Sequence, residues 1–366
     1  MPFDHGSIAL TICPLSSPLP EDYLEKLESA AAGKLEDVAE EPEIGWVSGR
    51  FLLETDINET TSLCGGHLYL NLRKAERKIP SSLLNAICRR DELAYMKANE
   101  TFSVPRQEKK RIKEDAVKRN LMKMPPVISG TPLVVDRALN VMYVGTASLT
   151  QVDLIISAFV SQLGVEPIPV TINELMLKLF KQETGALPDL TFSPNANAAG
   201  MDSTPGRDFL TWLWYFSELN AGELQIGDLG TFQLGIEGPL TFAFSAEAKG
   251  AEESVVKKGC PQISAEAKAA LAVGKKLKKA KILLARDQDV WSFTFDADKF
   301  NFSGLTLPEG EEMDRDSFFA ERVEYLHIFH QAIEAYFRKY VECVTGKTHG
   351  EVEKDIKKWA EDRESF

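Results

Sequence analysis

The sequence predicts an α+β fold. Strand and helix patterns follow one another irregularly along the 366 residues, without the regular strand–helix–strand alternation of a parallel sheet. Two strand pairs are predicted as hairpins, around Ala138–Asn140 and Asp287–Asp289. Hydrophobic residues make up 44% of the chain, which is enough to fill a core. A chain of this length predicts two or three subdomains.

Each element is predicted from the spacing of its apolar residues. Alternation, as at Ile8, Leu10 and Ile12, predicts strands over residues 7–14, 67–72, 133–136, 141–144, 165–172, 232–236, 240–244, 280–285, 290–295 and 300–307. Apolar residues three and four apart predict helices over residues 20–32, 79–99, 103–124, 149–163, 174–183, 208–219, 265–274, 314–344 and 351–361.

The predicted helix over residues 103–124 is unusually polar. Its apolar residues, Ile112, Ala116 and Leu121, form only a thin stripe, and Pro125 ends the helix. A helix of this kind is expected to contact the rest of the protein along one edge and to leave its basic face free.

The chain is predicted to divide into three consecutive regions. Residues 1–172 form an N-terminal α+β region that carries the basic helix, and residues 173–262 form a divergent region. Residues 263–366 form a C-terminal α+β region that ends in long helices. The Pro-, Asn-, Ser- and Gly-rich stretch 187–205 is the best candidate for a linker.

Positive charge is concentrated in an otherwise acidic chain. The formal net charge is -13, yet residues 73–90, 106–123 and 268–286 carry +5, +5 and +7. The remainder therefore carries -30. Such segregation predicts a surface that binds a polyanion. The alternative is that these lysines and arginines only solvate helix faces.

Several classes of protein do not fit the sequence. No apolar run is long enough to cross a bilayer, and the N-terminus has no signal-peptide core, so a cytoplasmic protein is expected. The five cysteines lie far apart, which argues against a zinc ribbon or a disulfide framework. The sequence contains no phosphate loop, dinucleotide fingerprint or nucleophile elbow, so no cofactor is predicted.

Two groups of residues are candidates for metal chemistry. Glu324, His327 and His330 are spaced by three residues, but a matching motif on a second helix is missing. Two aspartate pairs could hold a nuclease metal, although aspartate is also common at turns for local hydrogen bonding: Asp287 with Asp289, and Asp296 with Asp298. We therefore predict no catalytic residues and no metal site, and a metal-dependent exonuclease stays as an alternative.

The order of several motifs resembles the RdgC family of bacterial recombination-associated DNA-binding proteins. The resemblance covers most of the chain and rests on GWV at residue 45, LYLNLRKAERKIPSSLLNAIC, RQEKKRIKEDAVKRNLMKMP, LVVDRALNVMYVGTAS, PIPVTI, GRDFLTWLW, ISAEAKAALAVGKKLKKAKILL, VWSFTFD and MDRDSFFAERVEYL. At residues 125–128 this chain has Pro-Pro-Val-Ile where the family type carries aromatic residues that help to close a ring. Residues 187–259 are also more divergent.

The resemblance implies a horseshoe-shaped α+β monomer that pairs with a second copy. The resulting ring-shaped homodimer would encircle double-stranded DNA without reading its sequence. It would limit the access of RecA to DNA, and so modulate recombination and replication, as a nucleoid-associated cytoplasmic protein that is not an enzyme. The family has also been labelled an exonuclease. A protein-interaction module that binds an acidic partner, and no nucleic acid, is a further alternative.

The candidate DNA-binding residues come from the basic runs and from the resemblance. Lys257 and Lys258 fall where the family has a lysine pair, and Lys275 falls at its Gly-Lys step. With the basic runs, the predicted phosphate contacts are Arg73, Lys74, Arg77, Lys78, Lys109, Lys110, Arg111, Lys113, Lys118, Arg119, Lys123, Lys257, Lys258, Lys275, Lys276, Lys278 and Lys279.

Overall fold

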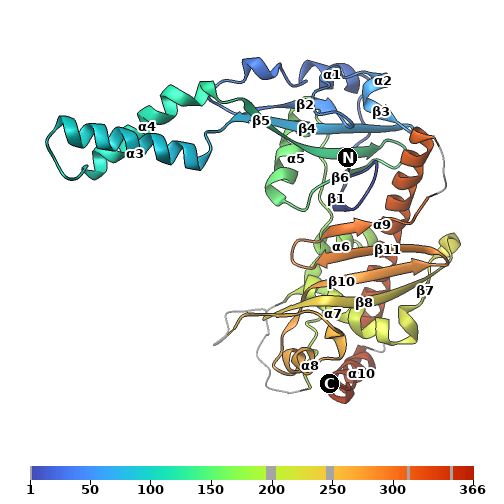
Figure 1. Cartoon of the computed structure of the whole chain (residues 1–366). Coiled ribbons are helices and arrows are strands. Elements are labelled where there is room, and N and C mark those ends of the chain that lie inside the picture. Colours follow the sequence, from blue (N-terminus) through green and yellow to red (C-terminus); the bar gives the residue numbers. More distant parts are fainter. Residues whose placement is uncertain (1, 195–202, 245–250, 311–313, 347–348) are drawn as a thin grey trace. The chain divides into compact units, whose positions relative to one another are not determined.

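The computed structural model of the chain forms two compact units (Figure 1). It describes residues 2–194, 203–244, 251–310, 314–346 and 349–366. Unit 1 comprises Met1–Leu19, Cys64–Leu68 and Val134–Phe366, and unit 2 comprises Pro20–Leu63 and Tyr69–Leu133. The mixed α+β class predicted from the sequence is confirmed.

The two units do not follow the three consecutive regions predicted from the sequence. Their boundary passes through strands β4 (His67–Arg77) and β5 (Pro126–Asp136), each of which contributes residues to both units. A boundary inside a continuous strand leaves no change in composition for sequence analysis to detect. The predicted linker 187–205 includes residues 195–202, which lie outside the described residues.

Unit 2 contains a small sheet in the order β2–β4–β5, with β2 and β4 antiparallel. Strand β2 spans Glu43–Ser48. The helices of this unit are α1 (Tyr23–Ser29), α2 (Glu59–Ser62), α3 (Ser81–Ala98) and α4 (Arg106–Asn120). Gly45 on β2 lies so close to the preceding loop that a Cβ there would be 2.5 Å from the Cα of Ala32. The glycine lets Trp46 exchange backbone hydrogen bonds with Ala30 and Ala32, which explains the Gly-Trp motif.

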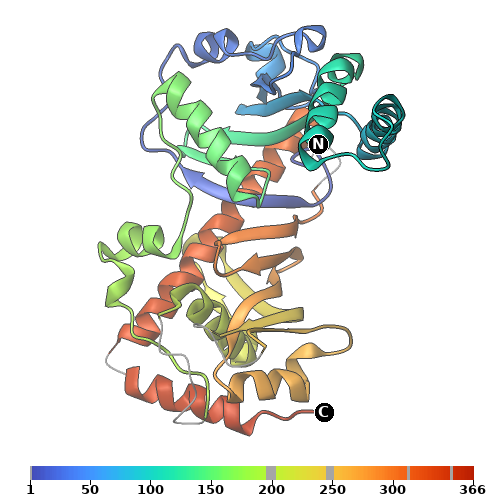
Figure 2. The ribbon, with the colours of Figure 1, turned by 90° about the vertical axis from the view of Figure 1, so that its left-hand side faces the viewer.

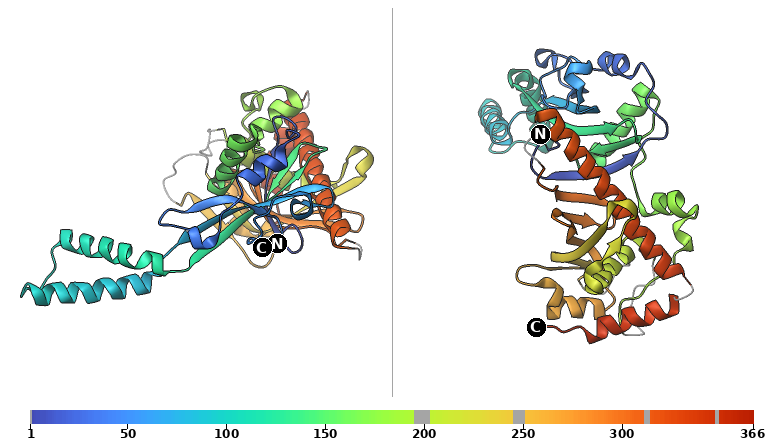
Figure 3. Two further views of the ribbon diagram at one scale, coloured as in Figure 1. Left: turned by 90° about the horizontal axis from the view of Figure 1, so that it is seen from above. Right: turned by 90° about the vertical axis from the view of Figure 1, so that its right-hand side faces the viewer.

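Helices α3 and α4 form an antiparallel hairpin that projects from the strands of unit 2 (Figures 1 and 3, left). No residue of α3 is buried, and α4 buries only Ile112 and Ala116. Phe102, in the turn between the helices, is fully exposed. The predicted thin apolar stripe therefore serves to hold α4 against α3, and the remaining faces of α4 are open to solvent.

Unit 1 is built on an antiparallel sheet in the order β6–β1–β12–β11–β10–β8–β7, and β9 also pairs with β8. The strands are β1 (Ile8–Pro14), β6 (Val141–Val144), β7 (Leu224–Gln225), β8 (Thr231–Ala243), β9 (Glu253–Val256), β10 (Lys276–Arg286), β11 (Asp289–Asp296) and β12 (Asn301–Thr306). The helices are α5 (Leu149–Leu163), α6 (Ile172–Phe180), α7 (Pro205–Glu218), α8 (Ala265–Ala272), α9 (Arg315–Thr345) and α10 (His349–Asp362).

The core of unit 1 lies between the sheet and helices α7 and α9 (Figures 2 and 3, right). Phe209 of α7 makes edge contacts with Phe295 of β11 and Phe337 of α9. Phe329 of α9 likewise packs against Phe293 of β11. These buried rings fix α7 against the sheet, and with it the start of β10 that the helix contacts.

Several predicted strands differ in the structure. Those predicted over residues 232–236 and 240–244 form one continuous strand, β8. Residues 165–172 make only isolated contacts with β1, through the amides of Ile168 and Val170, because Pro167 and Pro169 have no N–H to donate. Strand β10 begins at Lys276 rather than at residue 280, so most of the predicted basic run belongs to a sheet. No helix in the described part of the chain has the length and apolarity needed to cross a membrane.

Candidate nucleic-acid interface

Helix α4 presents the largest group of exposed cations in the predicted set. Lys109, Lys110, Arg111, Lys113, Lys118, Arg119 and Lys123, the last just beyond the helix, are all exposed. Arg106, Lys109, Lys110 and Lys113 are three or four residues apart, so they lie on one side of the first two turns.

Few of the cations of α4 are neutralised. Among the described residues, no acid lies within ion-pair distance of Lys109, Lys113 or Lys118. Lys110 is 3.8 Å from Glu114, and Arg111 is 3.1 Å from Glu108, both on the surface of the same helix. Exposed pairs of this kind are weak and exchange readily for another anion.

Arg119 has a different role from the other cations of α4. Its Nη2 atom lies 2.5 Å from a carboxylate oxygen of Asp91 on α3, and its Nε atom donates to the carbonyl of Asp115 at 3.2 Å. The contact with Asp91 joins the two helices of the hairpin, and the contact with Asp115 lies within α4. Lys118, one residue earlier, makes no such contact within the described structure.

The four basic residues between positions 73 and 78, of which Lys78 lies just beyond β4, are mostly engaged inside unit 2. Arg73 is only 2% exposed and donates to the carbonyls of Gly33 and Leu52. Arg77 donates to three further carbonyls, those of Glu36, Val38 and Met124. Arg73 and Arg77 therefore satisfy loop carbonyls, and their guanidinium groups do not fit the predicted role as phosphate contacts.

Lys74 and Lys78 share one acid. Each places its ammonium nitrogen 2.8 Å from a carboxylate oxygen of Glu76. Hydrogen bonds from Lys74 and Lys78 lower the pKa of Glu76 to about 2. The two lysines are on the surface, but a phosphate would have to compete with this carboxylate.

The lysines of β10 are paired with acids from other elements. Lys276 is 5% exposed and forms a buried ion pair with Asp208 of α7. Lys278 lies 2.5 Å from Glu253 of β9, and Lys279 lies 2.9 Å from Asp296 of β11. The run is acid-free in sequence, but folding pairs five of its seven cations with acids. For Lys276, burial in an ion pair does not fit the predicted phosphate contact.

Three groups in these ion pairs have shifted pKa values. Burial raises the pKa of Asp208 to about 6, although the ammonium of Lys276 acts in the opposite direction. The hydrogen bond between Lys278 and Glu253 raises the pKa of Lys278 and lowers that of Glu253. The shifts of Lys278 and Glu253 mark Lys278 as the partner of a protein carboxylate, whereas that of Asp208 reflects its burial.

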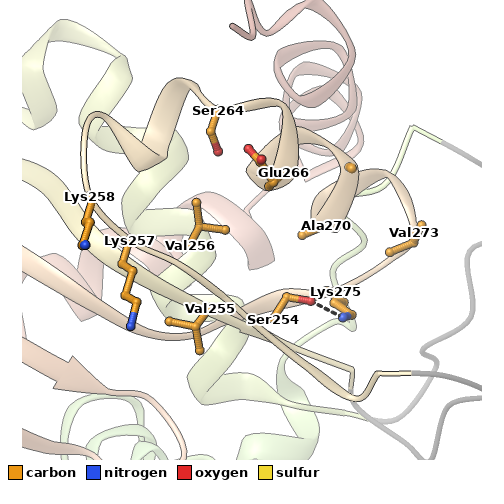
Figure 4. A pocket seen from close by; sticks show the side chains of 11 residues that line it. Ser254, Val255, Val256, Lys257, Lys258, Ser264, Glu266, Ala270, Val273 and Lys275 are labelled. Atoms are coloured by element: carbon orange, nitrogen blue, oxygen red, sulfur yellow. Dashed lines mark hydrogen bonds between the residues drawn. The ribbon is translucent and has the colours of Figure 1, made fainter.

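Three other predicted lysines surround one pocket in unit 1. Lys257, Lys258 and Lys275 line a cavity of about 630 Å³ between β9 and α8 (Figure 4). Lys257 and Lys258 are exposed in the segment that follows β9. Lys275 is 6% exposed, donates to the hydroxyl of Ser254 at 2.5 Å and lies 5.0 Å from the ring centre of Phe244.

Sequence reasoning missed the other walls of this pocket. Ser254 and Val255 come from β9, Ser264 caps α8, and Glu266 lies in its first turn. Ser264 and Glu266 lie in one of the stretches that resemble the family, but no spacing rule links them to Ser254 and Val255, because the pocket forms only when β9 pairs with β8 and α8 packs beside it.

Most of the residues considered for metal chemistry are engaged in local contacts. His330 lies 3.0 Å from Glu334, and His327 contacts Gln331. Asp289 pairs with Arg286 at 2.6 Å, and Asp298 receives two hydrogen bonds from Arg207. The search of the described residues found no group of three or more histidines, cysteines or acids that could hold a metal ion.

Comparison with protein-family models gives one match. Residues 15–178 match the family described as "Putative exonuclease, RdgC". The matched segment contains the whole α3–α4 hairpin and ends before the lysine pocket. A search of curated proteins found no match. The match supports membership of the RdgC family over residues 15–178, which are less than half of the chain.

Proposed function

We propose that this protein binds double-stranded DNA through its backbone phosphates and does not read base sequence. The observation that carries the proposal is the exposed, largely unpaired set of cations on α4, above all Lys109, Lys113 and Lys118. Lysine ammonium groups are mobile point charges, which suit phosphates whose positions do not depend on sequence. Membership of the RdgC family over the segment that contains α4 supports the same function.

Binding to two duplexes of equal length and unrelated sequence tests the proposal. Fluorescence anisotropy should give dissociation constants that agree within about twofold, because phosphate contacts carry no sequence information. Affinity should fall steeply as salt is added, since binding releases counterions. A protein that fails to bind either duplex at low salt would instead favour a protein-interaction module with an acidic partner.

The family likeness further supports a ring-shaped homodimer that encloses the duplex and restricts the access of RecA to it. Enclosure makes dissociation depend on DNA topology. The complex should last longer on a closed circle than on a linear duplex of the same length, and sedimentation should give two copies per particle. Equal lifetimes on the two substrates, measured on a protein that binds both, would contradict enclosure of the duplex.

The proposed function includes no bond cleavage, and a metal-dependent exonuclease is the competing activity. End-labelled duplex incubated with Mg²⁺ or Mn²⁺ distinguishes the two. The proposal predicts that the labelled duplex stays uncleaved. If the wild type releases nucleotides and Asp287→Asn or Asp289→Asn does not, the exonuclease would replace the proposed function. These two acids are candidates for a nuclease metal in the sequence.

A further inference from the structure

The pocket between β9 and α8 carries a positive charge that its own walls do not neutralise. Lys257, Lys258 and Lys275 line it, against a single acid, Glu266. Within the described residues, none of the three lysines has a carboxylate at ion-pair distance, in contrast to Lys278 and Lys279 nearby on β10. The pocket therefore favours an anionic ligand.

Lys275 is the most buried of these cations, and no described carboxylate compensates its charge. It is 6% exposed, and its described hydrogen-bond partner is the neutral hydroxyl of Ser254. A buried ammonium without a carboxylate is costly, and an ammonium can donate three hydrogen bonds. An incoming anion would supply both the missing charge and the missing acceptors.

The pocket has two basic ends with an apolar wall between them. Figure 4 shows Lys257 and Lys258 on one side of Val255, and Ser254 with Lys275 on the other. Val255 is 57% exposed, and Val273, also in the lining, is 50% exposed. Ser264 and Glu266 lie across the pocket on α8, where Ser264 already caps the helix, so the anion-binding part is the side of β9 and Lys275.

This arrangement matches the chemistry of a nucleotide. A phosphomonoester carries a charge of about -1.5 to -2 at pH 7 and has three acceptor oxygens, so it can enter a recess and meet Lys275. An internal phosphodiester is flanked by a sugar on both sides, which keeps it at the rim, where Lys257 and Lys258 lie. The volume of about 630 Å³ falls in the range typical of small-molecule sites.

We propose that this pocket binds a nucleotide by its terminal phosphate, with the phosphomonoester at Lys275 and Ser254 and the sugar against Val255. A further phosphate on the same ligand would reach Lys257 and Lys258. The ligand is either the phosphorylated end of a DNA strand or a free nucleotide. The first source rests on the proposed DNA-binding function, and the second does not.

Paired oligonucleotides test the proposal. Two short duplexes of one sequence, with 5′-phosphate or 5′-hydroxyl ends, are compared by anisotropy, and thymidine 3′,5′-bisphosphate is titrated by calorimetry. We expect the duplex with phosphorylated ends to bind about tenfold more tightly than the duplex with hydroxyl ends, or the free nucleotide to bind directly. The reason is that a terminal phosphate adds a charged hydrogen bond. A preference for phosphorylated ends identifies a strand end as the ligand, and binding of the bisphosphate alone identifies a free nucleotide.

Variants assign the effect to the pocket. Lys275→Met should abolish whichever response the wild type gives, and so should the exposed double variant Lys257→Gln/Lys258→Gln, which keeps the test valid if Lys275→Met does not fold. Lys281→Gln is the matched control, because Lys281 lies on β10 outside the pocket and pairs with Glu237. It should keep the response.

Two outcomes overturn the proposal. One is a wild type that binds both kinds of end equally and does not bind the bisphosphate. The other is a response that survives both pocket variants. If the DNA-binding proposal is wrong, the protein will not bind any duplex, whatever its ends. If only the pocket proposal is wrong, the protein will still bind duplexes.

Discussion

Helix α4 and strand β10 are both rich in lysine, yet the fold uses their charges in opposite ways. On α4, Lys109, Lys113 and Lys118 lie on open helix faces without acidic partners in the described structure. On β10, Lys276, Lys278 and Lys279 pair with acids that come from α7, β9 and β11. A projecting helix meets few other elements, whereas a strand inside a sheet has neighbours on both sides that can supply carboxylates. A run of like charge in sequence is therefore a binding surface only where the fold leaves it unpaired.

The largest effect should follow from breaking the buried pair of β10. Lys276→Met leaves the buried carboxylate of Asp208 without its cation, which is expected to cost about 3 kcal/mol of the free energy of unfolding. Urea denaturation at pH 7 measures the loss. The double variant Lys276→Met/Asp208→Asn removes the stranded charge and should recover part of the stability. A single variant as stable as the wild type would show that the pair contributes nothing.

The same pair predicts a pH dependence. The pKa of Asp208 is raised to about 6, above its ordinary value, so its contribution to stability is fully present below about pH 4 and is lost as the pH rises through 6. Asp208→Asn should flatten the stability of the protein over that interval relative to the wild type. A variant that keeps the full wild-type pH dependence would contradict the assignment.

The next largest effect should be on DNA affinity. Charge reversal at Lys109→Glu and Lys113→Glu together places acids where phosphates are proposed to bind, and should weaken duplex binding about tenfold or more without changing the free energy of unfolding. Lys26→Glu is the control, because Lys26 lies on α1 in the same unit and pairs with Asp22. A control that weakens binding as much as the double variant would mean that only net charge matters.

A much smaller effect is expected from the paired lysines of β10. Lys278→Gln with Lys281→Gln removes two positive charges that Glu253 and Glu237 already neutralise. Duplex affinity measured by anisotropy should change by about twofold or less, because acids beside these lysines compete with phosphate. A loss of duplex affinity as large as that of the α4 variant would contradict the difference between the cations of α4 and those of β10.

The smallest effect concerns Lys74 and Lys78, which hold Glu76 between them. Its pKa of about 2 means that the interaction is present above the ordinary pKa of glutamate and is lost as the pH falls toward 2. Lys74→Gln with Lys78→Gln should return the pKa of Glu76 toward its ordinary value in an NMR titration. A wild-type carboxyl that already titrates normally would show that both lysines are free for another anion.

Much of the fold could be predicted from local patterns, and the pairing of charges could not. The helices α4 and α9 and the hairpin of β10 and β11 follow from apolar spacing and turn residues, which act over a few positions. The prolines at 167 and 169 indicate an interrupted strand at an edge, but not that residues 165–172 make only isolated contacts with β1.

The candidate site depends on contacts between distant parts of the chain. Asp208 meets Lys276, and Ser254 meets Lys275, across intervals that no spacing rule covers. Arg73 looks like any other member of a basic run, yet the fold buries it against the carbonyls of Gly33 and Leu52. The sequence therefore identifies where cations are abundant, and only the tertiary structure tells which of them remain unpaired.

The salt dependence of duplex binding tests the central claim most directly. The slope of log affinity against log salt should fall by about 0.9 for each phosphate contact removed, so Lys109→Gln/Lys113→Gln/Lys118→Gln should flatten the slope by about 2.7 for each bound copy, relative to the wild type. The Lys26→Gln control should keep the wild-type slope. A triple variant whose slope equals that of the wild type would contradict the claim that α4 binds the DNA backbone.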